Sequence, residues 1–173
     1  YLLGAAVFAI PAFYFGGIWL WLTWPASALL LVSLNYALLD AEGFQKRADG
    51  SLSPAARWLL APYLAAAWLN SRLWTRNNPL PDQVLDDVWL GRIPTRRELK
   101  DSAFTAVFDL CAELSLDPGH VAFRTLPVLD LTAPTTAREL ARVARPGAVQ
   151  RGRRQLVLPA QRRARALRAR LRQ

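Results

Sequence analysis

The stretch "VWLGRIPTRRELKDSAFTAVFDLCAEL", residues 88–114, places a strand, a short helix and a second strand in succession. Thr95 followed three residues later by Glu98 is the signature of a capping box at a helix start. Phe104–Leu110 is an apolar run rich in β-favouring residues, and a second such run, Phe123–Leu129, follows the turn "LDPGH". Strands that alternate with helices predict a parallel or mixed α/β sheet. The apolar runs lack polar alternation, which suits strands buried on both faces.

The segments on either side extend this pattern. Upstream, "NNPLPDQVLDDVWLG" predicts a proline-rich junction and then one strand, Val84–Leu90, that ends at Gly91. Downstream, "PTTARELARVA" predicts a helix that starts at Thr135 or Thr136. Further on, "QLVL", Gln155–Leu158, is a candidate for one more strand.

The N-terminal segment carries no charged side chain from Tyr1 to Leu39. One crossing of a bilayer takes about 20 apolar residues, so this segment approaches two crossings. Gly16-Gly17 and Trp24-Pro25 are the possible turns, giving a first helix over Leu2–Phe15 and a second that ends near Leu39. A secretory signal peptide would need a basic start and a shorter apolar core, and neither is present. A buried helix of a soluble protein is the remaining alternative.

The next apolar segment, "SPAARWLLAPYLAAAWLNSRLWTRNN", predicts a helix with Ser53 as N-cap and Pro54 in the first turn. Its centre, Trp58–Leu69, is short for a crossing, contains Pro62 and is framed by tryptophans and arginines. This composition favours a helix in the headgroup region, with a third short span or a core-packing helix as alternatives. The basic residues that follow the uncharged run predict that this side is cytoplasmic.

The charge of the chain is concentrated at its C-terminal end. The formal net charge is +9, yet residues 138–173 hold twelve arginines and a single acid, Glu139, so the rest of the chain is close to neutral. One cysteine, Cys111, and one histidine, His120, exclude a disulfide framework and multi-cysteine or multi-histidine metal sites. We therefore expect no metal and no other cofactor, with both residues serving packing or the surface.

Asp130 is the candidate catalytic residue. It ends an apolar run and precedes a loop that contains Pro134. Ligand sites of open α/β sheets lie at the carboxyl ends of strands, where a carboxylate can give or take a proton. An aspartate at such a boundary is also a common helix cap or turn former, and the position alone leaves both readings open.

The order of these motifs resembles the dual-specificity phosphatase family of the protein tyrosine phosphatase superfamily. The resemblance rests on "VWLGRIPTRRELKDSAFTAVFDLCAE" and "RTLPVLDLTAPTTARELARVA", which carry the family's V-x-L-G, V-x-D-L and D-x-x-x-P phrases in order. It looks most like the bacterial membrane-attached branch, in which hydrophobic helices and a segment similar to "GFQKRADGSLSPAARWLLAPYLAAAWLNSRLWTR" come first. The resemblance covers roughly residues 43–144. It implies a three-layer α/β domain after transmembrane helices, with Asp130 as general acid.

The family's chemistry also requires a cysteine thiolate in an H-C-x5-R-[ST] loop after the next strand. If that strand is Gln155–Leu158, then Pro159 and Ala160 stand where histidine and cysteine should be, and Ala166 replaces the arginine. Without a thiolate no covalent intermediate forms. Cys111 matches no nucleophile position of the family. The chain is therefore expected to have no nucleophile, to hold an incomplete phosphatase-like domain and to be inactive.

Two explanations of the arginine-rich tail stay open. It is either a diverged terminus or the product of a reading frame lost near Arg145-Pro146, and the abrupt arginine excess favours the second. A start at Tyr1 and the lack of methionine also suggest a fragment. The expected layout has four parts. These are a transmembrane hairpin of one or two spans (1–39), a juxtamembrane interfacial helix segment (40–78), the N-terminal part of the phosphatase-like domain (79–144) and an irregular tail (145–173).

Two functions follow as expectations. The first is a membrane-anchored phosphatase-like protein of the bacterial inner membrane with a cytoplasmic soluble domain. By resemblance it would hydrolyse phosphomonoesters of phosphorylated proteins or phospholipid headgroups. The second is a non-enzymatic membrane protein whose arginine-rich tail binds anionic lipid or nucleic acid. Nucleic acid is the less favoured partner, because the tail lacks interleaved aromatic residues on which bases could stack.

Overall fold

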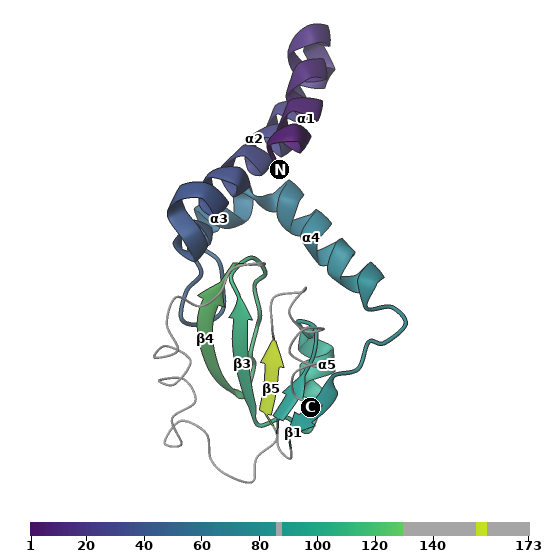
Figure 1. Cartoon of the computed structure of the whole chain (residues 1–173), viewed down its shortest axis with the longest axis vertical. Coiled ribbons are helices and arrows are strands. Elements are labelled where there is room, and N and C mark those ends of the chain that lie inside the picture. Colours follow the sequence, from purple (N-terminus) through teal and green to yellow (C-terminus); the bar gives the residue numbers. More distant parts are fainter. Residues whose placement is uncertain (86–87, 130–154, 159–173) are drawn as a thin grey trace.

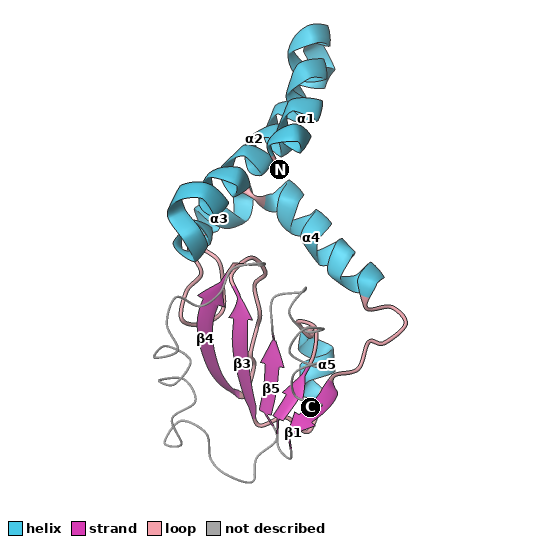
Figure 2. Cartoon of the chain, viewed as in Figure 1, coloured by secondary structure: helices cyan, strands magenta, loops and turns pink. Residues whose placement is uncertain are grey.

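The computed structural model of the protein describes residues 1–85, 88–129 and 155–158. Helices form the N-terminal part and a small sheet with one short helix follows (Figures 1 and 2). The helical elements of the first part are α1 Leu2–Phe15, the 3-10 helix η1 Gly17–Leu22, α2 Thr23–Leu34, the π-helical η2 Asn35–Leu39, the 3-10 helix η3 Asp40–Phe44, α3 Pro54–Leu59 and α4 Ala61–Trp74. The elements of the second part are β1 Asp82–Leu85, β2 Val88–Leu90, α5 Arg96–Lys100, β3 Ala106–Cys111, β4 Ala122–Val128 and β5 Gln155–Leu158.

Helices α1 and α2 form a hairpin that projects from the rest of the molecule (Figure 1). The chain reverses at Gly16 and Gly17, whose φ angles of 62° and 54° lie in the region that favours glycine. This is the first of the two predicted turns. The second, Trp24-Pro25, lies instead within a continuous helical stretch, at the start of α2.

The hairpin packs through small residues and exposes large ones. Its buried side chains are Ala5, Ala12, Ala26, Ala28 and Val32, and a Cβ added at Gly4 would lie 3.0 Å from Leu29 Cδ1. The exposed side chains include Leu3, Ile10, Phe13, Tyr14, Ile18, Trp21 and Leu38. Close contact between small residues, with bulky apolar side chains outside, is the arrangement of helices that pack in lipid. In water such a surface would be an unusually large exposed apolar patch.

One helical stretch of the described residues, Gly17–Phe44, is long and apolar enough to cross a membrane by length and composition. It has 28 residues and a mean hydropathy of 1.6. Helix α1 has 14 residues, which corresponds to a rise of about 21 Å. That is shorter than the hydrocarbon core of about 30 Å.

The predicted helix after Ser53 is divided into α3 and α4. Its start is confirmed, because the Ser53 hydroxyl accepts a hydrogen bond from the Ala56 amide at 3.1 Å and Pro54 occupies the first turn. The prediction of one continuous helix is wrong, since α3 ends at Leu59 and α4 begins at Ala61. Pro62 has no amide hydrogen to continue the first helix, but it fits the first turn of a new one.

The strands form one mixed sheet in the order β1-β2-β5-β3-β4, which confirms the predicted α/β class. Strands β2, β5, β3 and β4 run parallel to one another, and β1 is antiparallel to β2. The predicted single strand Val84–Leu90 is wrong. Asp82 pairs with Leu90 and Leu85 with Val88, so the chain reverses within that segment, where two turn-forming aspartates occur in sequence.

The candidate strand Gln155–Leu158 is confirmed as β5 and is the central strand of the sheet. Its Leu156 pairs with Trp89 of β2 on one side and with Val107 of β3 on the other. The capping box is also confirmed at α5, where Thr95 and Glu98 exchange both hydrogen bonds. The helix predicted to start at Thr135 or Thr136 lies outside the described residues.

Two apolar clusters form the core. The first joins α5 to β3 and the β3–β4 connection, with the members Ile93, Leu99, Val107, Leu114, Leu116 and Val121. The second joins the hairpin base and helices α3 and α4 to the ends of β3 and β4, with the members Ala28, Val32, Phe44, Leu52, Ala56, Leu60, Tyr63, Ala112 and Leu129. The second cluster therefore fixes the apolar helices against the sheet.

Candidate functional site

The carboxyl ends of β3, β4 and β5 lie at the same end of the sheet, facing α3 and α4 (Figure 1). Ligand sites of open α/β sheets occur at this end. Leu129 follows β4 there and is 1% exposed, within the cluster that holds Phe44 and Tyr63. The predicted general acid, Asp130, is the next residue and lies outside the described residues. Pro159, Ala160 and Ala166 lie outside them as well.

A buried ion pair anchors the carboxyl end of β3. The Lys46 ammonium donates to Asp109 Oδ2 at 2.6 Å and to the Leu114 carbonyl at 2.7 Å, and it also donates to the Cys111 carbonyl. Both charged side chains have no exposed area. All three donors of the ammonium are satisfied, as a buried lysine requires. Burial raises the pKa of the Asp109 carboxyl, and the Lys46 charge acts against that shift.

The loop that delivers Lys46 is shaped by a tight turn. Lys46 and Leu52 form an antiparallel bridge, and between them Asp49 Oδ1 accepts hydrogen bonds from the Ser51 amide and hydroxyl. These bonds lower the pKa of Asp49. Gly50 completes the turn at a φ of 85°, and its carbonyl accepts a hydrogen bond from the Leu116 amide at 3.1 Å. The loop is therefore bonded to the β3–β4 connection both through Lys46 and through Gly50.

A second polar link joins the same connection to the helices. The Tyr36 hydroxyl, from the long apolar stretch, donates to Glu113 just after β3. The rings of Tyr1 and Tyr63 meet edge to face with centroids 5.6 Å apart. Burial and the nearby charge of Glu113 raise the pKa of Tyr63, so its hydroxyl stays protonated. This cluster and the Lys46 network hold the residues after β3 from two directions.

Cys111 is not suited to act as a nucleophile. Burial raises the pKa of its thiol to about 11, and the Asp109 charge adds to that effect. The thiolate is the reactive form, so at neutral pH almost none is present. The thiol therefore serves packing at the end of β3, one of the two roles that the sequence predicted. His120 is exposed on the β3–β4 connection.

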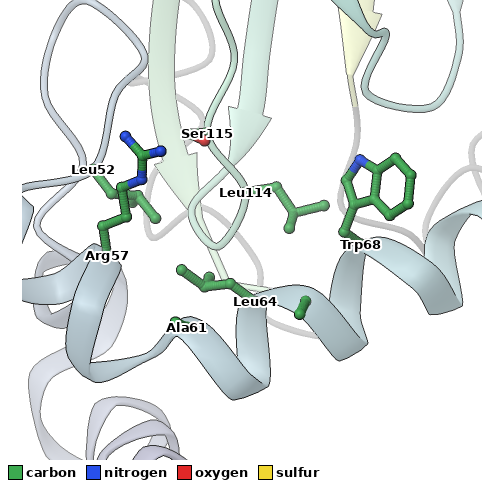
Figure 3. Close-up of a pocket in the computed structure, with 8 residues that line it drawn as sticks. Leu52, Arg57, Ala61, Leu64, Trp68, Leu114 and Ser115 are labelled. Atoms are coloured by element: carbon green, nitrogen blue, oxygen red, sulfur yellow. The ribbon is translucent and has the colours of Figure 1, made fainter.

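A cleft of about 300 Å³ lies between the helices and the β3–β4 connection (Figure 3). Its lining is largely apolar and consists of Leu52, Arg57, Ala61, Leu64, Ala65, Trp68, Leu114 and Ser115. Arg57 and Trp68 stand at opposite sides, with Leu64 and Leu114 between them (Figure 3). Arg57 is the charged residue of this lining, so the cleft favours an anionic group over a cationic one.

A third charged cluster is structural. Glu98 of α5 lies 2.5 Å from Arg92 and 3.3 Å from Arg72 of α4, and Arg72 also donates to the Ile93 carbonyl. Partial burial alone would raise the pKa of Glu98. The hydrogen bonds from Thr95 and Arg92 outweigh that effect and lower the pKa to about 2. The cluster ties the end of α4 to the start of α5.

Comparisons with models of protein families, with curated proteins and with solved structures find no match for this chain. Within the described residues, no group of three or more His, Cys, Asp or Glu side chains is placed to hold a metal ion.

The sequence alone does not predict the buried network of Lys46 and Asp109. Asp109 is the aspartate of the "VFDL" phrase, and its place in an apolar run is a usable signal. The sequence around Lys46 gives no signal of burial, because Lys46 stands in a polar segment that is typical of a surface loop. Its partner lies 63 residues away in the sequence.

Proposed function

We propose that this chain is a membrane-anchored phosphatase-like protein of the dual-specificity class. Its site for a phosphomonoester would lie at the carboxyl edge of the sheet, and the residues that follow β5 would leave it catalytically silent. The observation that carries the proposal is the central position of β5, parallel to β2 and β3. In the family that the sequence resembles, the strand after the aspartate loop leads into the nucleophile loop.

The ends of two strands support this interpretation. Strands β4 and β5 are parallel and end at the same edge of the sheet, with only β3 between them. An aspartate just after β4 and an anion-binding loop just after β5 would therefore be near neighbours. Asp130 would protonate the leaving oxygen of the substrate, a role worth about 10²–10⁴-fold in rate.

The residues after β5 lack the side chains that the phosphatase reaction of this family requires. Pro159 and Ala160 offer no thiolate, and Ala166 offers no guanidinium to hold phosphate oxygens. No glycine lies between these two alanines to let backbone amides face a phosphate.

The membrane part of the proposal rests on the hairpin. Its exposed large side chains and the apolar stretch Gly17–Phe44 suit a bilayer. The basic residues Lys46, Arg47 and Arg57 follow that stretch and favour a cytoplasmic sheet at a bacterial inner membrane. The substrate would be a phosphorylated protein or a phospholipid headgroup at that surface.

The test compares two proteins. The first is the full 173-residue chain, purified in detergent and assayed for release of p-nitrophenol from p-nitrophenyl phosphate. The second carries, after Leu158, the residues encoded by an alternative reading frame of the same DNA. We expect one such frame to encode H-C-x5-R there, the second protein to hydrolyse the ester and the first to stay at background.

Either of two results would overturn the proposal. Turnover by the unaltered chain would mean that the chemistry does not use the family's loop. If no frame encodes the loop, and a loop of the family's type grafted after Leu158 gives no turnover, the sheet is not a phosphatase scaffold. The second function would then be favoured, a membrane protein whose arginine-rich tail binds anionic lipid with a steep salt dependence.

A further inference from the structure

Helices α3 and α4 expose an apolar face that the sheet does not cover. Leu69 and Leu73 are four residues apart and share one side of α4, and they are 53% and 56% exposed. Ala67 and Ser71, on the other side, face the core. In α3, Trp58 and Leu59 are exposed as well. We call these four side chains, Trp58, Leu59, Leu69 and Leu73, the platform face.

The platform face is joined directly to the base of the hairpin. The indole of Trp24, at the start of α2, stacks on that of Trp58 with centroids 5.5 Å apart and an angle of 27° between the rings. The Trp24 Nε1 also donates to the Trp58 carbonyl at 3.2 Å. In Figure 1, α4 leaves the base of the hairpin and passes over the carboxyl end of the strands. The platform therefore keeps a fixed position relative to the hairpin.

The chemistry of this region fits the boundary between lipid and water. Tryptophan favours that boundary because its ring is apolar and its N–H is polar. Trp74, at the end of α4, is 72% exposed, and Trp68, which lines the cleft beside the platform, is 47% exposed. Arg57 and Arg76 are exposed in or just after these helices, and each can meet a lipid phosphate.

We propose that the platform face lies in the headgroup layer of the bilayer that holds the hairpin, with anionic phospholipid as its occupant, an inference that rests on the membrane anchoring proposed above. The exposed apolar side chains of the hairpin continue into those of α3 and α4 through the contact between Trp24 and Trp58. A helix in this layer has its apolar side about 5–10 Å into the boundary with the acyl chains. The carboxyl edge of the sheet and the cleft at Arg57 would then open beside the lipid headgroups.

The experiment places spin labels on the full chain in vesicles of phosphatidylcholine mixed with phosphatidylglycerol. The variants Leu69→Cys and Leu73→Cys report on the platform face. Lys100→Cys, on the exposed side of α5, is the matched control. Cys111 is left in place, and a sample without an introduced cysteine measures its background labelling. The readout is the relaxation of each label by dissolved oxygen and by a water-soluble nickel complex.

We expect the labels at positions 69 and 73 to be relaxed more by oxygen than by nickel, at a shallow depth, and the label at position 100 to show the reverse. Equal nickel relaxation at all three positions would overturn the proposal. Labels at positions 69 and 73 that lie at the bilayer centre would also overturn it, because α4 would then be a third span. Protection of these labels from both reagents would overturn it too, because α4 would then be a core helix. Spin–spin broadening that disappears on dilution with unlabelled protein would also overturn it, because a second copy would then cover the face.

Discussion

The Lys46 ammonium lies 2.6 Å from Asp109 Oδ2, and both side chains are fully buried. Lys46 follows the apolar stretch Gly17–Phe44 by two residues, and Asp109 is in β3. The contact therefore joins the segment that suits a membrane to the sheet that holds the candidate site. Hairpin and sheet are connected by a specific buried contact rather than by a free linker.

Removing one partner of this pair should be strongly destabilising. Lys46→Met leaves the buried Asp109 carboxylate without its counter-charge, and Asp109→Asn does the same to the Lys46 ammonium. Each change should lower the unfolding free energy by about 3–5 kcal/mol. The double variant Lys46→Met/Asp109→Leu should lose less, because neither charge remains. Chemical denaturation in detergent measures these values, with Arg47→Met at the exposed neighbouring position as control. Single variants as stable as the control would show that the pair has no structural role.

Gly50 should be intolerant of a side chain. A Cβ at this position would lie 2.7 Å from the Leu116 carbonyl oxygen and 2.8 Å from Phe123 Cζ, at a φ of 85°. Gly119 has a similar φ of 58° but nothing within 4 Å. Gly119→Ala should therefore cost about 1 kcal/mol from backbone strain alone. Gly50→Ala should cost at least about 1 kcal/mol more, because a backbone atom must move. Equal losses in the two variants, measured by chemical denaturation, would contradict the packing of this loop.

Glu98 should make stability depend on pH in the acid range. Its pKa is about 2 in the folded protein and 4.5 as a reference for the unfolded chain. The contribution is therefore complete above pH 4.5 and is lost as the pH falls toward 2. Glu98→Gln should flatten this part of the profile of unfolding free energy against pH. Glu42→Gln, at an exposed glutamate outside the cluster, is the matched control variant. A profile that stays equally steep in Glu98→Gln and in this control would contradict the role of the cluster.

The Cys111 thiol should be unreactive in the folded chain. Its raised pKa of about 11 leaves almost no thiolate at neutral pH, and the side chain is partly buried. A chromogenic disulfide reagent should label it only after denaturation, at one thiol per chain. Rapid labelling of the folded protein at neutral pH would mean that the end of β3 is open to solvent.

Local signals in the sequence predict the local structure well. Ser53-Pro54 and the pair Thr95 and Glu98 mark helix starts that the structure confirms, because their hydrogen bonds form within three residues. The turn at Gly16-Gly17 follows in the same way from glycine's access to positive φ. The alternation of apolar runs and helix signals is enough to predict a mixed or parallel sheet.

The wrong predictions have specific physical causes. The apolar pattern places Pro62 inside one helix, whereas Pro62 lies in the first turn of a second helix that follows a break at Leu60. The same pattern runs through the two aspartates between Leu85 and Val88, although they separate two strands. The place of β5 between β2 and β3 depends on contacts far apart in sequence, and so does the burial of Lys46. Periodicity in one sequence does not record such contacts.

The most direct test of the central claim, that the carboxyl edge of this sheet is a phosphomonoester site, concerns Asp130. In the form that carries an H-C-x5-R loop after Leu158, Asp130→Asn should lower turnover by about 10²–10³-fold at neutral pH, as expected for the loss of a general acid. KM should change little, and the basic limb of the pH profile should flatten while the acidic limb remains. Near-full turnover of the asparagine variant on an ester with a poor leaving group would contradict the account, because Asp130 would then be only a loop residue.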